Sequence, residues 1–141
     1  MKISTKGRYA LRLMLELALH DANQWISVKE IAKNQEISGK YLEQIITQLH
    51  RAMLVQSVRG AQGGYRLAKR PEEITVGMVL RAVEGELAPV SCLEGVNCCP
   101  RREDCVTLEV WQKIQEAISS VVDTLTLQDL VLRHHEKQAH K

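Results

Sequence analysis

The sequence places every cysteine of the chain in one short stretch, which runs from Cys92 to Cys105. The residues between them are mostly glycine, asparagine, proline and charged side chains, so the stretch offers no apolar face to bury thiols. Thiolates are nucleophiles and ligands for soft metals, and clustered thiols in a reducing compartment seldom form stable disulfides. The residue types therefore predict a metal or thiol site made of Cys92, Cys98, Cys99 and Cys105.

The spacing of the cysteines bears on which metal they would hold. Five residues separate Cys92 from Cys98, and five separate Cys99 from Cys105. Structural zinc sites prefer two to four residues between paired ligands, so the spacing disfavours zinc without excluding it. An iron–sulfur cluster has separated iron atoms and suits widely spaced thiolates on a pliable loop, where the two neighbouring arginines could offset its negative charge.

The size and composition of the chain suit one compact unit. It has 141 residues, of which 45% are hydrophobic and 26% are charged, the balance of a globular protein. It contains no apolar run of the roughly 18 to 20 residues that a membrane helix requires, and its N-terminus lacks the pattern of a secretory signal. We therefore expect a cytoplasmic protein with no membrane contact.

Charge is distributed unevenly along the chain. Residues 1–70 hold 12 Lys and Arg against 5 Asp and Glu, which gives +7, and residues 71–141 hold 7 against 12, which gives −5. The first half suits a polyanion such as nucleic acid, although uneven charge alone is equally compatible with solvated surfaces.

The first half contains a predicted helix-turn-helix. Ser27 forms a capping box with Glu30 at the start of a short helix, and after a turn Ser38 is placed to cap a longer helix. The longer helix has Leu42, Ile45, Ile46, Leu49 and Met53 at helical spacing on its inner face. Its outer face is polar, and its N-terminal end would enter the major groove of DNA. The outer face is made of Lys40, Tyr41, Glu43, Gln44, Thr47, Gln48 and Arg51.

An N-terminal helix, capped by Ser4 or Thr5, precedes the helix-turn-helix. Lys6 and Arg8 lie near its start, where basic side chains suit either phosphate contact or simple solvation. Apolar residues on both faces of this helix indicate that it is buried between two partners.

A glycine-rich hairpin follows the helix-turn-helix at once. Its predicted strands cover 54–59 and 65–67, and this order of elements is typical of a winged helix. Arg59, at the base of the tip, could reach into a narrow minor groove. A short helix that begins at Thr75 and ends at Gly85 is expected to back the wing, which completes a DNA-binding domain over residues 1–85.

The second half is predicted to hold a cysteine loop over 86–106 and dimerisation helices over 107–132. A long helix from Thr107 places apolar residues at alternating steps of four and three. The chain has little core left to cover this seam, so a second copy is expected to cover it. The seam consists of Trp111, Ile114, Ile118, Val121 and Leu125, widened by Val110 and Ala117. Thr126 is expected to cap one last turn around Leu127 and Leu130, with 133–141 as a flexible tail.

Four motifs follow one another along the chain: Met1-Lys-Ile-Ser-Thr-Lys-Gly-Arg-Tyr-Ala, Ser38-Gly-Lys-Tyr-Leu-Glu-Gln, Val58-Arg-Gly-Ala-Gln-Gly-Gly-Tyr, and the cysteine loop with Cys105-Val-Thr-Leu-Glu-Val-Trp. Together they resemble the bacterial winged-helix regulators typified by the iron–sulfur cluster regulator IscR. The resemblance implies a homodimer that binds a [2Fe-2S] cluster, reads operator DNA and controls genes for cluster assembly or a related stress. It also implies that the loop cysteines hold the cluster, that Arg59 acts in the wing, and that the recognition helix uses Ser38, Tyr41, Glu43 and Gln44.

The chain departs from the pattern of the family at two places. Three cysteines suffice in the family, whereas here Cys98 and Cys99 compete for the middle place, and we favour Cys99 because five residues then separate it from Cys105. The family has a histidine three residues after the third cysteine, but here that residue is Leu108, which cannot ligate. Either the site has three thiolates and is labile, or a fourth ligand comes from the partner chain or from Cys98, Glu103, Asp104 or Glu109.

We therefore predict a mainly α fold with a small β-hairpin wing, a winged helix-turn-helix joined to a long dimerisation helix. The predicted function is a cluster-dependent repressor that binds a near-palindromic operator with recognition helices roughly 34 Å apart. Loss or oxidation of the cluster would change the loop and, through it, the recognition helix and wing. The alternative is a thiol- or zinc-based sensor of redox state, nitric oxide or cysteine supply on the same fold. An enzyme is not expected, because no histidine lies near the cysteines in sequence and no substrate-pocket motif occurs.

Overall fold

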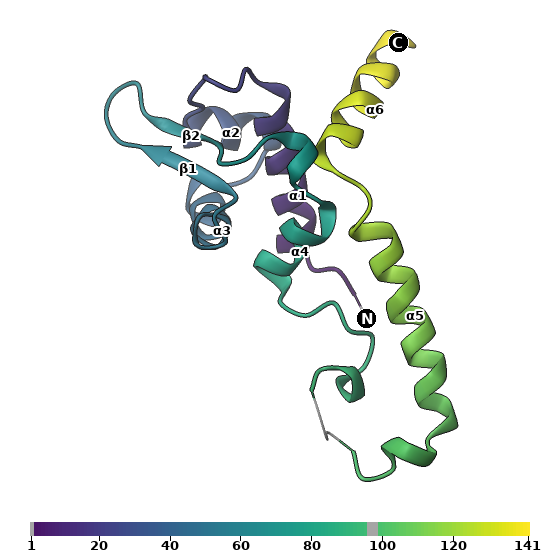
Figure 1. Cartoon of the computed structure of the whole chain (residues 1–141). Coiled ribbons are helices and arrows are strands. Elements are labelled where there is room, and N and C mark those ends of the chain that lie inside the picture. The colour runs from purple at the N-terminus through teal and green to yellow at the C-terminus, as the bar shows by residue number, and fades with distance from the viewer. Residues whose placement is uncertain (1, 96–98) are drawn as a thin grey trace.

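The computed structural model describes residues 2–95 and 99–141. Within these ranges the chain forms six α-helices, three short 3-10 helices and one antiparallel pair of strands. Figure 1 shows α1 to α4 and the hairpin gathered into one body, with α5 running along its side. In chain order the elements are α1 (Thr5–Leu19), α2 (Val28–Gln35), α3 (Gly39–Arg51), β1 (Val55–Val58), β2 (Gly64–Leu67), η1 (Pro71–Glu73), α4 (Val76–Glu84), η2 (Ser91–Leu93), η3 (Arg102–Asp104), α5 (Val106–Val122) and α6 (Leu127–Ala139).

The main core lies where α1, α2, α3 and the hairpin meet. The inner face of α3 is buried as its periodicity predicts, and Leu13 and Met14 of α1 are buried in the same core. Each fully buried aliphatic side chain contributes about 1.5–3 kcal/mol relative to an exposed one. Serine side chains cap all three helices at Ser4, Ser27 and Ser38, where each hydroxyl accepts a backbone N–H.

Met53 does not belong to the buried face of α3, and the sequence-based expectation was wrong here. The helix ends at Arg51, and Met53 has a left-handed backbone with φ 63° and a side chain that is 72% exposed. The N–H of Met53 donates to the carbonyl of His50, and the N–H of Leu54 donates to that of Leu49. This pattern ends a helix with a left-handed residue, so the buried position passes to Leu54.

The hairpin pairs Val55 with Leu67 and Val58 with Gly64, so β1 is shorter than predicted. Ile26, in the segment before α2, pairs with Tyr65 through two backbone hydrogen bonds of 2.9 and 2.7 Å. Successive side chains of a strand point to opposite faces. Ser57 and Tyr65 therefore share the face towards α3, and the cross-strand pair of Gln56 and Arg66 lies on the other face.

α4 packs mainly against α1 and α3 rather than behind the hairpin, which corrects the expected placement. Thr75 caps its start, and Gly85, with φ 82°, ends it. Its N-terminal half also faces α5, where a second small core forms between the two helices. This core joins Val76, Leu80 and Leu87 to Ile118 and Val122, with contributions from Ile3, Leu11 and Leu130.

The C-terminal helix α6 is longer than the single turn that the sequence suggested, and it occupies most of the expected flexible tail. Leu127 is fully buried in the main core, and α6 packs against α1. Tertiary packing of Leu127 and Val131 stabilises a segment whose end is otherwise polar. The assignment of functions to the separate segments of the chain remains a prediction. Across the described ranges, no helix combines the length and the apolar character needed to cross a membrane.

Candidate functional site

The outer face of α3 is largely free to meet a ligand. Lys40, Glu43, Gln44, Thr47 and Arg51 are exposed, as predicted for a face that reads DNA. Two residues of the predicted face, Tyr41 and Gln48, are instead half-buried. The Oε1 atom of Gln48 is buried without a hydrogen-bond partner in the described part of the chain. The hydroxyl of Ser38 accepts the N–H of Tyr41 at 3.1 Å, so this serine already serves as a helix cap.

The start of α1 lies beside the start of α3. The rings of Tyr9 and Tyr41 meet edge to face, with centroids 6.1 Å apart, and the guanidinium of Arg12 lies 5.4 Å from the Tyr9 ring. Lys6 is half-buried and Arg8 is exposed in the first turn of α1. Tyr9 and Arg12 of α1 therefore lie next to the start of the polar face of α3, which local sequence patterns did not indicate because the two tyrosines are far apart in the chain.

The tip of the hairpin carries Arg59, which is exposed. Gly60 has φ 115°, and a Cβ atom at Gly63 would collide with the backbone of Val58, so the tip requires glycine at these places. The other arginine of the hairpin behaves differently: the guanidinium of Arg66 lies over the ring of Trp25 at 4.0 Å. The tip thus presents one cation, as predicted for a wing.

The cysteine site lies at the far end of α5 from the hairpin (Figure 1). Cys92 is in η2, Cys99 precedes η3, and Cys105 is the N-cap residue of α5. These three cysteines line one small cavity together with Arg102 and Leu108. Cys98, the fourth predicted ligand, lies outside the described residues.

Arg102 joins the two arms of the cysteine loop. Its Nη1 donates to the carbonyl oxygen of Cys92 at 2.9 Å, and its backbone N–H donates to the carbonyl of Cys99 at 3.2 Å. The sequence suggested a purely electrostatic role for this arginine. Its hydrogen bonds also set the distance between the cysteine-bearing segments.

Cys105 has the environment of a reactive thiol. Its Sγ lies 3.3 Å from the hydroxyl oxygen of Thr107, and this hydrogen bond, with others from the backbone at Leu108 and Thr107, lowers the pKa of the Cys105 thiol below its ordinary value. The positive charge of Arg101 acts in the same direction. The position at the start of α5 places the sulfur at the positive end of a helix dipole, which also favours the thiolate.

Leu108 is 7% exposed and lies against the cavity, at the place where the family pattern has histidine. Among the other candidates for a fourth ligand, Glu103 lies near Cys99 at the edge of an adjoining hollow. Asp104 and Glu109 are exposed and do not line the cavity.

The donor set fits a soft metal or an iron–sulfur cluster, because three thiols of different segments face one space. The space itself is about 20 Å³, the room of roughly one water molecule. In the ranges that the structure describes, no three His, Cys, Asp or Glu side chains are close enough to surround a metal ion. The chemistry of the site therefore fits a cluster, but the loop would have to open to accept one.

A short helix, a turn, an exposed second helix and a hairpin with a cationic tip define a winged helix-turn-helix protein. The profile of the Rrf2 family, described as an iron-dependent transcriptional regulator, matches residues 3–133. The chain therefore belongs to the Rrf2 family of transcriptional regulators. This membership is consistent with the expectation that the protein is not an enzyme.

The similar proteins include regulators named IscR and regulators named CymR. The regulator CymR of Bacillus subtilis is 44% identical over 92% of this chain and 89% of its own length. Its solved structure, described as that of a global cysteine regulator, has a TM-score of 0.78 and covers 94% of this chain and 98% of its own. The regulator IscR of Aliivibrio salmonicida is 40% identical over 98% of this chain and 82% of its own length. The structure of T. potens IscR has a TM-score of 0.79 at 41% identity, over 98% of this chain and 91% of its own.

Proposed function

We propose that this protein is a homodimeric repressor whose affinity for a near-palindromic operator depends on a [2Fe-2S] cluster held by the cysteine loop. The observation that carries the proposal is the convergence of Cys92, Cys99 and Cys105 on one cavity at the start of α5. Genes for iron–sulfur cluster assembly are the proposed targets, by similarity to the relatives named IscR.

The DNA-binding part of the proposal is supported by the surface that joins α1, α3 and the hairpin tip. Gln44 and Glu43 are exposed on α3 and carry groups that pair with base edges in the major groove. Lys6, Arg8 and Lys40 would contact phosphates, and Arg59 would enter the minor groove. Ser38 and Tyr41 are proposed to act at the same place, with the serine hydroxyl donating its proton outward while its oxygen caps the helix.

A homodimer is supported by the apolar stripe that α5 leaves uncovered. One side of α5 packs towards α4 through Ile118 and Val122. The other side exposes large apolar side chains that a single chain does not cover, which is the usual mark of an interface. These are Val106, Val110, Ile114 and Val121, and Leu125 extends the stripe past the end of the helix.

The cluster part of the proposal assigns distinct tasks to residues of the loop. Cys92, Cys99 and Cys105 would supply thiolates, with Cys98 as the alternative to Cys99 or as a fourth ligand. Thr107 lowers the pKa of the Cys105 thiol and so favours its thiolate, and Arg102 holds the Cys92 and Cys99 segments together. A bound [2Fe-2S] cluster supplies a charge and a stability that respond to oxidants and to iron supply.

Contacts of the last turn of α4 would transmit a change in the loop. The cysteine loop is remote from the hairpin in Figure 1, so a direct contact between them is not the route. Arg81 of α4 pairs with Asp123 after α5, and three residues further along α4 Glu84 accepts hydrogen bonds from the N–H and hydroxyl of Ser4 before α1. We propose that movement at the start of α5 reaches the start of α1, and the α3 beside it, through these contacts.

A second candidate is a thiol-based sensor of oxidants or of cysteine supply, with no iron. Leu108 in place of a histidine ligand, and the lowered pKa of the Cys105 thiol, both favour this candidate. The similarity to a global cysteine regulator also favours this candidate. A zinc-binding variant would use the same thiols.

The deciding experiment is purification without oxygen, followed by an absorption spectrum and assays of iron, acid-labile sulfide and zinc on one sample. About two irons and two sulfides per chain would support the cluster. Cys98→Ala and Cys99→Ala, compared with Cys92→Ala, would then identify the middle ligand. A colourless protein that takes up no iron after reconstitution would leave the thiol sensor, or the zinc sensor if zinc is present.

An operator selected from random duplexes allows the switch itself to be tested. The same preparation should bind the selected operator with different affinities before and after removal of the cluster. Equal affinities across several selected operators would contradict the proposed switch, while leaving the DNA-binding function intact.

A further inference from the structure

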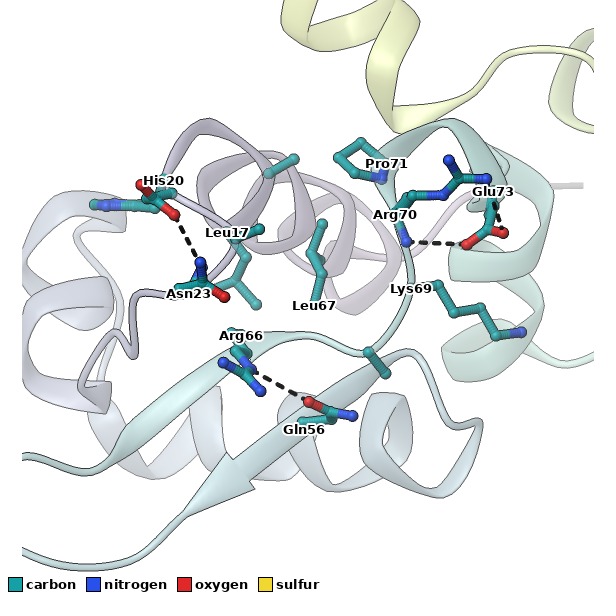
Figure 2. Close-up of a pocket in the computed structure, with 14 residues that line it drawn as sticks. Leu17, His20, Asn23, Gln56, Arg66, Leu67, Lys69, Arg70, Pro71 and Glu73 are labelled. Carbon is teal, nitrogen blue, oxygen red and sulfur yellow. Dashed lines mark hydrogen bonds and ion pairs between the residues drawn. The ribbon is translucent and has the colours of Figure 1, made fainter.

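A pocket of about 360 Å³ lies at the base of the hairpin, where its lining includes Gln56 and Arg66 of the face that points away from α3. Figure 2 shows it between the end of α1, the residues that follow α1, the hairpin and the segment leading into η1. We propose that this pocket binds a small organic anion, a carboxylate with a short apolar body, anchored by Arg66. Neither the cysteine site nor the surface assigned to DNA uses it, so the proposal goes beyond the proposed function.

Arg66 is held in a defined position on the wall of the pocket. Its guanidinium lies 4.0 Å from the ring centre of Trp25, and its Nε donates to Oε1 of Gln56 at 3.2 Å. Its Nη1 and Nη2 atoms make no hydrogen bond or ion pair with any residue that the structure describes. A planar guanidinium with both of its Nη atoms unoccupied matches the two oxygens of a carboxylate, and its stacking reduces the entropy lost on binding.

The balance of charge in the pocket favours an anion. Both acidic side chains of the lining already accept hydrogen bonds: Glu73 from Arg70, and Asp21 from the N–H of Asn23. Arg66 forms no ion pair among the described residues, and the charge of Lys69 acts on Glu73 without a direct contact, so the three cations of the lining, Arg66, Lys69 and Arg70, outnumber its two carboxylates. An anionic ligand would supply the missing counter-charge.

The rest of the lining suits an apolar body. Leu17 is 4% exposed and borders the pocket, and half-buried Leu67 and Pro71 lie beside it. In Figure 2 Leu17 and Leu67 lie between Arg66 on one side and Pro71 on the other. The volume lies at the lower end of the range, about 300–1,000 Å³, that is typical of small-molecule pockets.

The position of the pocket argues against DNA as its ligand. Ser57 and Tyr65 share a hollow with α3, whereas Gln56 and Arg66 occupy the opposite face of the same two strands. A duplex seated on α3 and on the hairpin tip would meet the first face. A ligand that contacts both Arg66 and the end of α1 would hold the base of the hairpin in place. Binding of this ligand does not depend on the proposed function. An effect of the ligand on operator affinity rests on the proposed function.

The test uses Trp25 as a reporter. The chain has two tryptophans, so Trp111→Phe leaves Trp25 as the only one. In this background we expect 3-phenylpropanoate to change the Trp25 emission saturably, with a Kd of about 1 mM or tighter. Its neutral counterpart 3-phenylpropanamide should bind at least about tenfold more weakly, because it lacks the charge that pairs with Arg66.

Variants are compared by calorimetry, which does not depend on the reporter. Arg66→Gln should weaken 3-phenylpropanoate binding about tenfold or more. Arg133→Gln, which removes an exposed arginine of α6, is the matched control and should leave the affinity unchanged. If Arg66→Gln proves unfolded by circular dichroism, Arg66→Lys takes its place, because it keeps the charge and loses only the planar fork.

Three results would overturn the proposal. One is the absence of saturable binding of 3-phenylpropanoate to folded protein, and another is equal binding of the acid and the amide. The third is displacement of the probe by a random DNA duplex, together with a loss of duplex affinity in Arg66→Gln, which would make the pocket a phosphate contact of DNA. The assay needs neither a cluster nor an operator, so its outcome is independent of the proposed function.

Discussion

Arg81 of α4 and Asp123, the residue after α5, are joined at two points. Nη1 lies 2.5 Å from Oδ1, and Nη2 lies 3.0 Å from Oδ2. Gly77 packs against the same carboxylate, where a Cβ atom would collide with it. This joint connects the helix proposed to dimerise with the helix that supports α1 and α3.

Asp123→Asn should lower the free energy of unfolding by about 0.5 kcal/mol at neutral pH, because both partners are more than a third exposed. The hydrogen bonds from Arg81 lower the pKa of Asp123 below its ordinary value of 3.8. The contribution of this pair is therefore complete above that value and is lost as the pH falls through the lowered pKa of the folded state. Urea unfolding at fixed protein concentration, at neutral pH and at about pH 3, measures both effects. Glu136→Gln, which breaks the more exposed Arg133 pair, is the control and should change little.

Gly7→Ala should destabilise the protein by up to about 1 kcal/mol, because the Glu84 carboxylate would have to move and give up its hydrogen bonds to Ser4. Gly7 is buried, and a Cβ atom there would collide with the carboxylate of Glu84. Gly39→Ala provides the contrast, because its Cβ atom would meet only Val28 at an ordinary 3.7 Å. That change in the first turn of α3 should be neutral or stabilising by up to about 1 kcal/mol. Equal effects of the two substitutions on thermal unfolding would contradict the tight packing of α1 against α4.

Leu108→His should lengthen the lifetime of the cluster in air, if the cluster occupies the proposed site. The side chain at this position lines the cavity with the three cysteines, so an imidazole there would add a ligand. The buried histidine should also cost about 1–3 kcal/mol of stability in the absence of a metal. Leu108→Asn, polar and similar in size but a poorer ligand, is the matched control. The decay of the visible absorption after exposure to air is the measurement, and equal decay in both variants would count against ligation at this position.

Gln44→Ala should weaken binding to a selected operator by about 1–3 kcal/mol while leaving random duplexes bound as before. Gln44 is exposed on α3, where its amide can pair with a base edge. Arg59→Ala should weaken binding to both kinds of duplex at low salt, if its contribution is mainly electrostatic. Gln138→Ala, on the exposed end of α6, is the control. Fluorescence anisotropy at two salt concentrations separates a base-specific contact from an electrostatic one. An unchanged operator affinity in Gln44→Ala would contradict a contact between Gln44 of α3 and a base.

Ile114→Glu should convert the proposed dimer to a monomer, because it places a charge in the centre of the exposed stripe of α5. Ser120→Glu adds the same charge to the same helix outside the stripe and should remain dimeric. Light scattering after size exclusion gives the mass of each variant. The monomer should also lose most of its operator affinity, since a single chain reaches only one half-site. A dimeric Ile114→Glu variant would place the interface elsewhere.

The sequence by itself determined the elements that depend on local physics. The spacing of apolar residues and the serine caps located α1, α2 and α3, and the glycines at the hairpin tip located the wing, because these signals act over a few residues. The cysteine loop was also visible in the sequence, because all four cysteines lie in one short polar stretch, and what they bind stays a prediction. The end of α3 was not visible in the sequence. Met53 has the hydrophobicity of a core residue, and only the left-handed turn before β1 excludes its side chain from the core.

Only the tertiary structure decided which distant residues meet. The contact of Tyr9 with Tyr41, the stacking of Arg66 on Trp25 and the burial of Leu127 each join segments that are far apart in the chain, and no local pattern encodes them. The length of α6 has the same origin, because its packing against α1 stabilises residues that are polar on their own. The cavity beside Leu108 likewise exists only because the folded loop returns Cys92 to the start of α5.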